Sequence, residues 1–121
     1  MPTNYLPGRY TIPAAVTGDT FAGIPELSVT VNGSSPSSSL ASVRMQFRTS
    51  ATATTAALEL TSADSEITIN DAAAWNITVE PFSISLDAGN YVYDIEFTDA
   101  GGDVKTYVTG TWSVAQDVTR T

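Results

Sequence analysis

The chain has 121 residues, contains neither cysteine nor histidine, and carries thirteen acidic against five basic side chains, for a net charge of −8. This length suits one domain with one hydrophobic core. The composition excludes disulfides, thiol nucleophiles and histidine general bases, and the negative charge opposes binding to a phosphate backbone. We therefore expect no enzyme, no cofactor and no nucleic-acid partner.

No stretch approaches the roughly 20 apolar residues that a membrane helix needs. The first residues, MPTNYLPGRY, also lack the basic start and apolar core of a signal peptide. We expect a soluble protein that is made in the cytoplasm and has no membrane partner.

The first 17 residues combine three prolines with large apolar side chains. Because proline cannot donate to a sheet ladder, this segment is a poor central strand, yet it is too apolar for a free tail. We predict an extended N-terminal arm over residues 1–17. It either docks onto another subunit or folds onto the edge of its own domain. Its candidate contact residues are Tyr5, Leu6, Tyr10 and Ile12.

Residues 18–121 are predicted to form one β-sandwich domain of about seven or eight short strands. Alternating apolar and polar residues, interrupted by turn signals, are typical of such a fold. A serine-rich loop is expected at residues 34–39. Before the final strand pair, the expected strands lie near residues 27–31, 43–48, 58–60, 67–69, 75–79 and 82–84.

The strand at residues 43–48 has the clearest inside and outside. Three apolar side chains alternate there with Arg44, Gln46 and Arg48. The even spacing places Arg44 and Arg48 on one outward face. This face is either a solvated sheet surface or a rim contact to an acidic neighbouring subunit.

The strongest strand pair is predicted in residues 90–120, around a glycine turn at residues 99–103. Val92, Asp94 and Glu96 alternate with four large apolar side chains, which are Tyr91, Tyr93, Ile95 and Phe97. The return strand alternates from Val104 to Val114. In a regular strand Tyr107 lies on the opposite face from Trp112, so we expect Tyr107 to be exposed and to be a candidate partner contact.

The acidic residues leave two chemical alternatives. Asp94 and Glu96 share a strand face, as the paired carboxylates of a glycosidase would, and the turns at residues 64–71 and 99–103 offer oxygen ligands for calcium. Two acids at this spacing are common on any solvated strand, neither turn has EF-hand spacing, and turn aspartates usually bond to their own backbone. We predict no catalytic and no metal-binding residue.

The hairpin also resembles small structural proteins of tailed bacteriophages and prophages. The matching features are a G-x-Y-x-Y-D-I-E strand from Gly89 to Glu96, then Gly102, Gly110, Val114 and the closing residues 117–120. Upstream, residues 18–20 and 41–48 are similar to the family's opening and second strand. The resemblance covers the chain from about residue 17 to its C-terminus.

The resemblance implies an immunoglobulin-like antiparallel β-sandwich in a tail, baseplate or fibre context. We therefore expect a non-enzymatic virion protein that binds other virion subunits and is a homo-oligomer in the particle, with a tail, baseplate or fibre adaptor favoured. One alternative is a capsid cement (decoration) protein. Another is a carbohydrate- or receptor-binding module that uses exposed tyrosines.

Overall fold

The computed structural model describes residues 8–30, 36 and 38–116, which contain strands and no helix. The predicted all-β class is therefore confirmed. No helix long and apolar enough to cross a membrane occurs within these residues. The strands are β1 (Gly8–Arg9), β2 (Ala15–Val16), β3 (Thr20–Phe21), β4 (Ile24–Ser28), β5 (Leu40–Arg48), β6 (Leu58–Thr61), β7 (Ile67–Asp71), β8 (Asn76–Val79), β9 (Phe82–Ser83), β10 (Gly89–Asp99) and β11 (Val104–Ala115).

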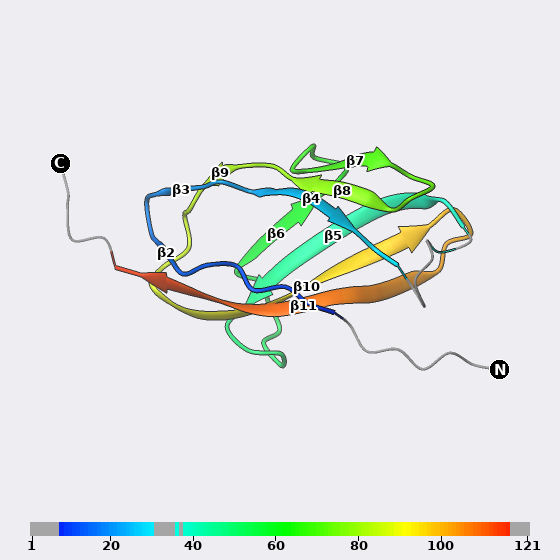
Figure 1. The fold of residues 1–121 in the computed structure, drawn as a ribbon. Helices are drawn as coiled ribbons and strands as arrows, with labels where there is room; N and C mark the ends of the chain where they lie inside the picture. Colours follow the sequence, from blue (N-terminus) through cyan, green and yellow to red (C-terminus); the bar gives the residue numbers. More distant parts are fainter. Residues whose placement is uncertain (1–7, 31–35, 37, 117–121) are drawn as a thin grey trace.

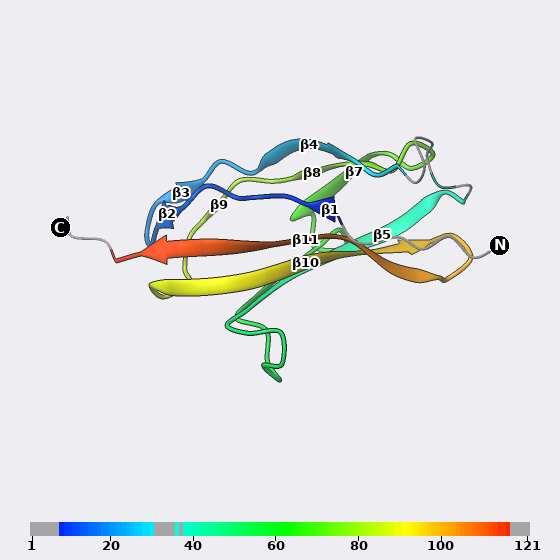
Figure 2. The same cartoon turned by 60° about the horizontal axis from the view of Figure 1, so that its bottom comes forward.

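The strands form two main sheets and one short pair. The larger sheet has the order β1-β11-β10-β5-β6, with β2 also paired to β11. The smaller sheet has the order β4-β8-β7, and β3 pairs with β9. Figures 1 and 2 show the smaller sheet lying over one face of the larger sheet. The other face of the larger sheet is its outer face.

The core lies between the two sheets and takes side chains from both of them. The predicted alternation is confirmed here, because every second residue of β8, of residues 43–48 in β5 and of residues 91–97 in β10 is buried while its neighbours are not. The aromatic rings are in mutual contact, with the Phe47 ring centroid 5.3 Å from Trp112 and 5.4 Å from Tyr93. The largest fully buried side chains are Trp75, Trp112, Phe47 and Phe97.

The N-terminal segment runs along the outer edge of β11. Both β1 and β2 pair with β11 in parallel, and between them Ile12 is buried to 3% exposure. The Tyr10 amide donates to the Thr109 carbonyl at 3.1 Å, and Trp112 Nε1 donates to the Pro13 carbonyl at 3.0 Å. Of the two predicted alternatives, residues 8–17 therefore follow the edge segment folded onto its own domain.

Tyr107 is half-buried, so the expectation that it is exposed is wrong, while its role as a partner contact stays a prediction. The β10–β11 register moves from Ile95 opposite Val108 to Glu96 opposite Thr106, which leaves Tyr107 as the extra residue of a β-bulge. The bulge shifts the alternation by one position, so Tyr107 is half-buried against the core. Its ring centroid lies 5.8 Å from that of Trp75.

The turn before β8 is tighter than the sequence predicts. The Asp71 carboxylate accepts hydrogen bonds from the Ala73 and Ala74 amides at 3.1 and 3.2 Å. Trp75 then adopts a left-handed backbone with a φ of 54°, and β8 begins one residue later than expected. Burial of the Trp75 ring and a 2.6 Å bond from its Nε1 to the Ser38 carbonyl hold this unusual conformation.

Candidate functional site

The outer face of the larger sheet collects most of the polar side chains that the sequence singled out. The strand alternation directs Arg44, Gln46 and Arg48 of β5 outward, beside Asp94 and Glu96 of β10. The antiparallel register places Arg44 opposite Glu96 and Gln46 opposite Asp94. The predicted shared face of Arg44 and Arg48 is thus confirmed, as is that of Asp94 and Glu96.

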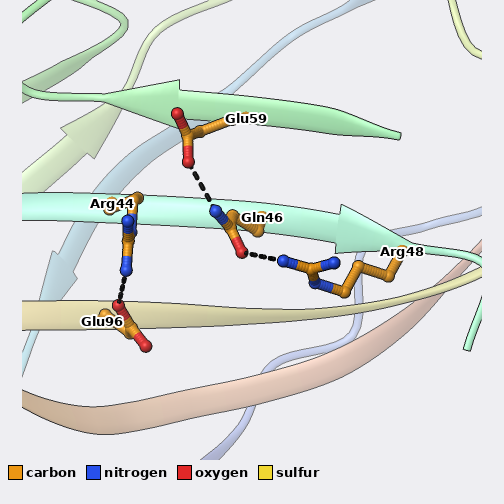
Figure 3. A network of polar contacts seen from close by, with 5 residues as sticks. All are labelled: Arg44, Gln46, Arg48, Glu59 and Glu96. Atoms are coloured by element: carbon orange, nitrogen blue, oxygen red, sulfur yellow. Dashed lines mark hydrogen bonds and ion pairs between the residues drawn. The ribbon is translucent and has the colours of Figure 1, made fainter. Parts of the chain in front are cut away.

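Three hydrogen bonds order this face, as Figure 3 shows. Arg44 Nη2 donates to Glu96 Oε1 at 2.6 Å, and the two side chains remain 51% and 31% exposed. This bond, together with the charge of Glu96, raises the pKa of Arg44 above its ordinary value. Gln46 Nε2 donates to Glu59 of β6, and Arg48 Nη2 donates to Gln46 Oε1 at 2.8 Å. The two arginines are therefore held by groups of their own chain.

The loop between β5 and β6, residues 49–57, projects beyond the outer face (Figure 2). It contains only serine, threonine and alanine. Its base is held by Arg48, whose Nη1 donates to the Ala53 carbonyl at 2.8 Å, and by the Ala57 amide, which donates to the Phe47 carbonyl at 2.7 Å. Arg48 thus joins the loop to the sheet.

A small open hollow of about 160 Å³ lies where this loop meets the sheet. We call it the loop-base hollow. It combines a guanidinium, a carboxylate, an amide and a hydroxyl group with two short apolar side chains. Its main lining residues are Gln46, Arg48, Ala51, Val92, Asp94 and Thr109.

Asp94 is the unusual member of the loop-base hollow. It is half-buried, and within the described part of the chain its carboxylate accepts no hydrogen bond and forms no ion pair. Burial raises the pKa of Asp94 above its ordinary value, and the neighbouring Glu96 raises it further. Arg48 and Arg44 act in the opposite direction without reversing the shift.

The other predicted contact residues are not brought to this face. Tyr10 and Ile12 pack on the core beside β11, and Tyr107 packs on Trp75. Tyr5 and Leu6 lie outside the described residues. The sequence analysis missed Gln46 and Glu59 as partners of this network. The strand pairing of β5 with β6 and β10 was the signal that would have found them, and it is not encoded locally.

The turns that were considered for calcium use their carboxylates internally. Asp99 Oδ1 accepts hydrogen bonds from the Gly101 and Asp103 amides at 2.9 and 3.1 Å. Glu66 Oε1 accepts from the Thr61 amide at 3.0 Å. Among the described residues, no three acidic side chains are grouped so as to hold a metal ion.

The outer face of the smaller sheet carries a second polar network, made of uncharged and acidic side chains. Asn76 Nδ2 donates to Ser28 Oγ at 2.7 Å and to Glu26 Oε1 at 3.1 Å, and Asn70 Nδ2 donates to Asn76 Oδ1 at 2.9 Å. Glu80 accepts from Thr68 Oγ1. Each carboxylate in this network has a hydrogen-bond donor, in contrast to Asp94.

Comparison with known proteins identifies no relative of this chain. No protein-family model, curated protein sequence or solved structure matches the chain. The class that the fold itself defines is an all-β protein with a β-sandwich-like architecture. The loop-base hollow and the ordered polar network on the outer face are the candidate binding features of this fold.

Proposed function

We propose that the chain is an immunoglobulin-like β-sandwich that acts as a non-enzymatic structural protein of a tailed bacteriophage particle. In this proposal it is a homo-oligomeric adaptor in the tail, baseplate or fibre region. It is made in the host cytoplasm and binds other virion subunits through protein–protein contacts.

Two observations support the immunoglobulin-like assignment. Sheets ordered β4-β8-β7 and β11-β10-β5-β6 correspond to the two sheets of that fold, with β10 and β11 in the places of its last two strands. In addition, the Tyr91 hydroxyl donates to the Asp87 carbonyl at 2.6 Å, four residues upstream at the start of β10. This is the geometry of a tyrosine corner, which is a hallmark of such sandwiches.

The observation that carries the virion proposal is where the phage-like motif lies in the structure. The G-x-Y-x-Y-D-I-E segment forms most of β10, at the centre of the larger sheet. Its tyrosines are buried in the core, whereas Asp94 and Glu96 point to the outer face. One short motif thus supplies both the core of the domain and the centre of its candidate contact surface.

The outer face has properties that suit contact with another protein. It is an ordered sheet surface of mixed charge, with a projecting loop of small uncharged residues beside it. Because the side chains of the face are already fixed by mutual hydrogen bonds, this chain would lose little side-chain entropy on binding a partner. A short edge strand such as β6 is a further place where a neighbouring subunit can add contacts.

The competing carbohydrate- or receptor-binding function would need an exposed aromatic platform. The described tyrosines do not form one, because Tyr91 and Tyr93 are buried and Tyr10 and Tyr107 are half-buried against the core. This favours the structural role. A capsid cement protein uses the same kind of contact surface and differs from an adaptor only in its place on the particle.

Mass spectrometry of purified tailed particles tests the proposal. Particles from the source of this sequence should contain the chain in a fixed number of copies relative to a major virion protein, after density-gradient purification and a high-salt wash. A protein that washes off, or whose amount varies between preparations at constant major-protein content, would refute a structural role.

A further inference from the structure

We infer that the loop-base hollow binds a basic side chain, the ammonium or guanidinium group of a protein partner, with the Asp94 carboxylate as its counter-charge. This inference deepens the proposed assembly function and rests on it for the statement that the partner is a neighbouring virion subunit. The binding chemistry itself rests on the hollow.

The first step is the local imbalance at Asp94. A half-buried carboxylate without a hydrogen bond is unfavourable, because it loses part of its hydration, and the charges of Arg48 and Arg44 offset only part of this loss. Elsewhere on both outer faces the carboxylates have donors, as Glu96 has Arg44 and Glu26 has Asn76. A position that departs from the pattern of its surroundings is where a functional contact is expected.

The second step is that the two nearby arginine side chains form hydrogen bonds with groups other than Asp94. Arg44 is bonded to Glu96, and Arg48 is bonded to Gln46 and to the carbonyl of Ala53. Moving Arg48 onto Asp94 would break the bonds that hold the loop at residues 49–57. The network therefore keeps both arginines in place beside the carboxylate and leaves its oxygens open to an incoming donor.

The third step is the shape and chemistry of the hollow. Val92 and Ala51 offer short apolar side chains against which the methylene stem of a lysine or arginine can pack. The Thr109 hydroxyl donates its proton to the Tyr93 carbonyl at 3.1 Å, so its oxygen can still accept a hydrogen bond. A cationic group at the floor of the hollow would then have two oxygen acceptors, Asp94 and Thr109.

The fourth step is the charge of the whole chain. With a net charge of −8, two copies repel each other at long range, whereas a basic partner is attracted. This decides between a second copy of the chain and a different, basic protein as the occupant of the hollow. Arg44 and Arg48 already have partners within the chain, and the sequence-based alternative of an acidic neighbour for these two residues stays a prediction.

An NMR titration of the isolated 15N-labelled protein tests the inference. The probe is N-acetyl-lysine-N-methylamide, and the control probe is the norleucine analogue, which has nearly the same stem and no ammonium group. We expect the lysine probe to shift the backbone amides of Gln46, Val92, Asp94 and Thr109, with millimolar affinity. The variant Asp94→Asn should weaken this binding by at least about fivefold.

The matched control is Glu80→Gln, at the residue that follows β8, which removes an equal charge outside the lining of the hollow. It should leave the affinity of the hollow unchanged. The inference is overturned if the norleucine probe produces the same shifts, if Asp94→Asn binds as tightly as the wild type, or if the shifts spread over all acidic turns. The spectrum of each variant without probe shows whether it is folded, and Asp94→Ser, which also removes the charge, is the substitute if Asp94→Asn is not.

This titration and the particle analysis can fail separately. If the hollow binds the lysine probe and the chain is missing from particles, the proposed function is wrong while the binding chemistry stands. If the chain is a constant particle component and the probe does not bind, the hollow is not the contact point.

Discussion

Gly110 lies where two other parts of the chain cross β11. A Cβ atom at this position would overlap the carbonyl oxygen of Tyr10 and the phenol of Tyr93, which donates a hydrogen bond to that carbonyl. The glycine therefore lets the N-terminal segment close over the sheet. The glycine in β11 thus has a packing reason.

Gly110→Ala is expected to destabilise the fold by about 2 to 3 kcal/mol, because backbone atoms on one side and a buried ring on the other leave no room for the methyl group. Urea unfolding measures the change. Gly101→Ala is the matched control, since its added Cβ would meet only the Asp99 side chain in an exposed turn, and it should stay within about 0.5 kcal/mol. Equal effects of the two substitutions would contradict this interpretation.

Asp94→Asn is expected to change the pH dependence of unfolding. The raised pKa of Asp94 means that its ionised form is less favourable in the folded than in the unfolded protein. The wild type therefore gains stability relative to the variant as the pH falls through this pKa, and the variant has its full relative advantage at neutral pH.

The charged groups that face Asp94 are Glu96 on the same strand and Arg44 and Arg48 on β5, while β11 contributes the uncharged Thr109. Urea unfolding of both proteins between about pH 3 and pH 7 measures the difference in their free energies of unfolding. A difference that moves in favour of the variant on acidification, or that does not change with pH, would show that the carboxylate is not in an unfavourable environment.

At the scale of elements, the N-terminal edge segment is part of the fold. Ile12→Ala should lower the free energy of unfolding by about 2 to 4 kcal/mol, the usual cost of truncating a buried isoleucine. The neighbouring exposed Thr11 provides the control, and Thr11→Ala should change stability by less than about 0.5 kcal/mol. Equal stability of the Ile12 variant and the wild type would show that the segment is a detachable arm.

The sequence predicts the elements whose information is local. The β10–β11 hairpin and the two-faced β5 follow from period-two alternation over many residues and from a glycine turn. The parallel pairing of β1 and β2 with β11 joins residues about 100 positions apart in proline-interrupted sequence, so no local pattern encodes it. The exposure predicted for Tyr107 is wrong for a related reason. One extra residue in a strand moves the following side chains to the opposite face of the sheet, and no local sequence pattern marks it.

The same division holds for the candidate site. The even spacing of Arg44 and Arg48 is enough to predict their common face. The bonds from Arg44 to Glu96 and from Gln46 to Glu59 are not predictable in this way, since they depend on the register between β5 and its two neighbouring strands. The unpaired state of Asp94 emerges only after all of these bonds are assigned.

At the scale of the whole molecule, the acidic charge, the ordered outer face and the projecting loop fit a component that binds a basic neighbour in a larger assembly. In the proposed assembly, this charge would make free copies repel each other, and contact with a basic subunit would reduce that repulsion. In this proposal the outer face of the domain makes the contacts with other subunits, and the core holds that face rigid.

Electron microscopy of purified particles with a gold-labelled antibody against the chain tests the central claim most directly. We predict label at the tail end, in the region of the baseplate or fibres; label over the head would move the assignment to a capsid cement protein within the same structural class. Intact particles without label, although the antibody binds the purified protein and its epitopes are accessible, would contradict the virion assignment.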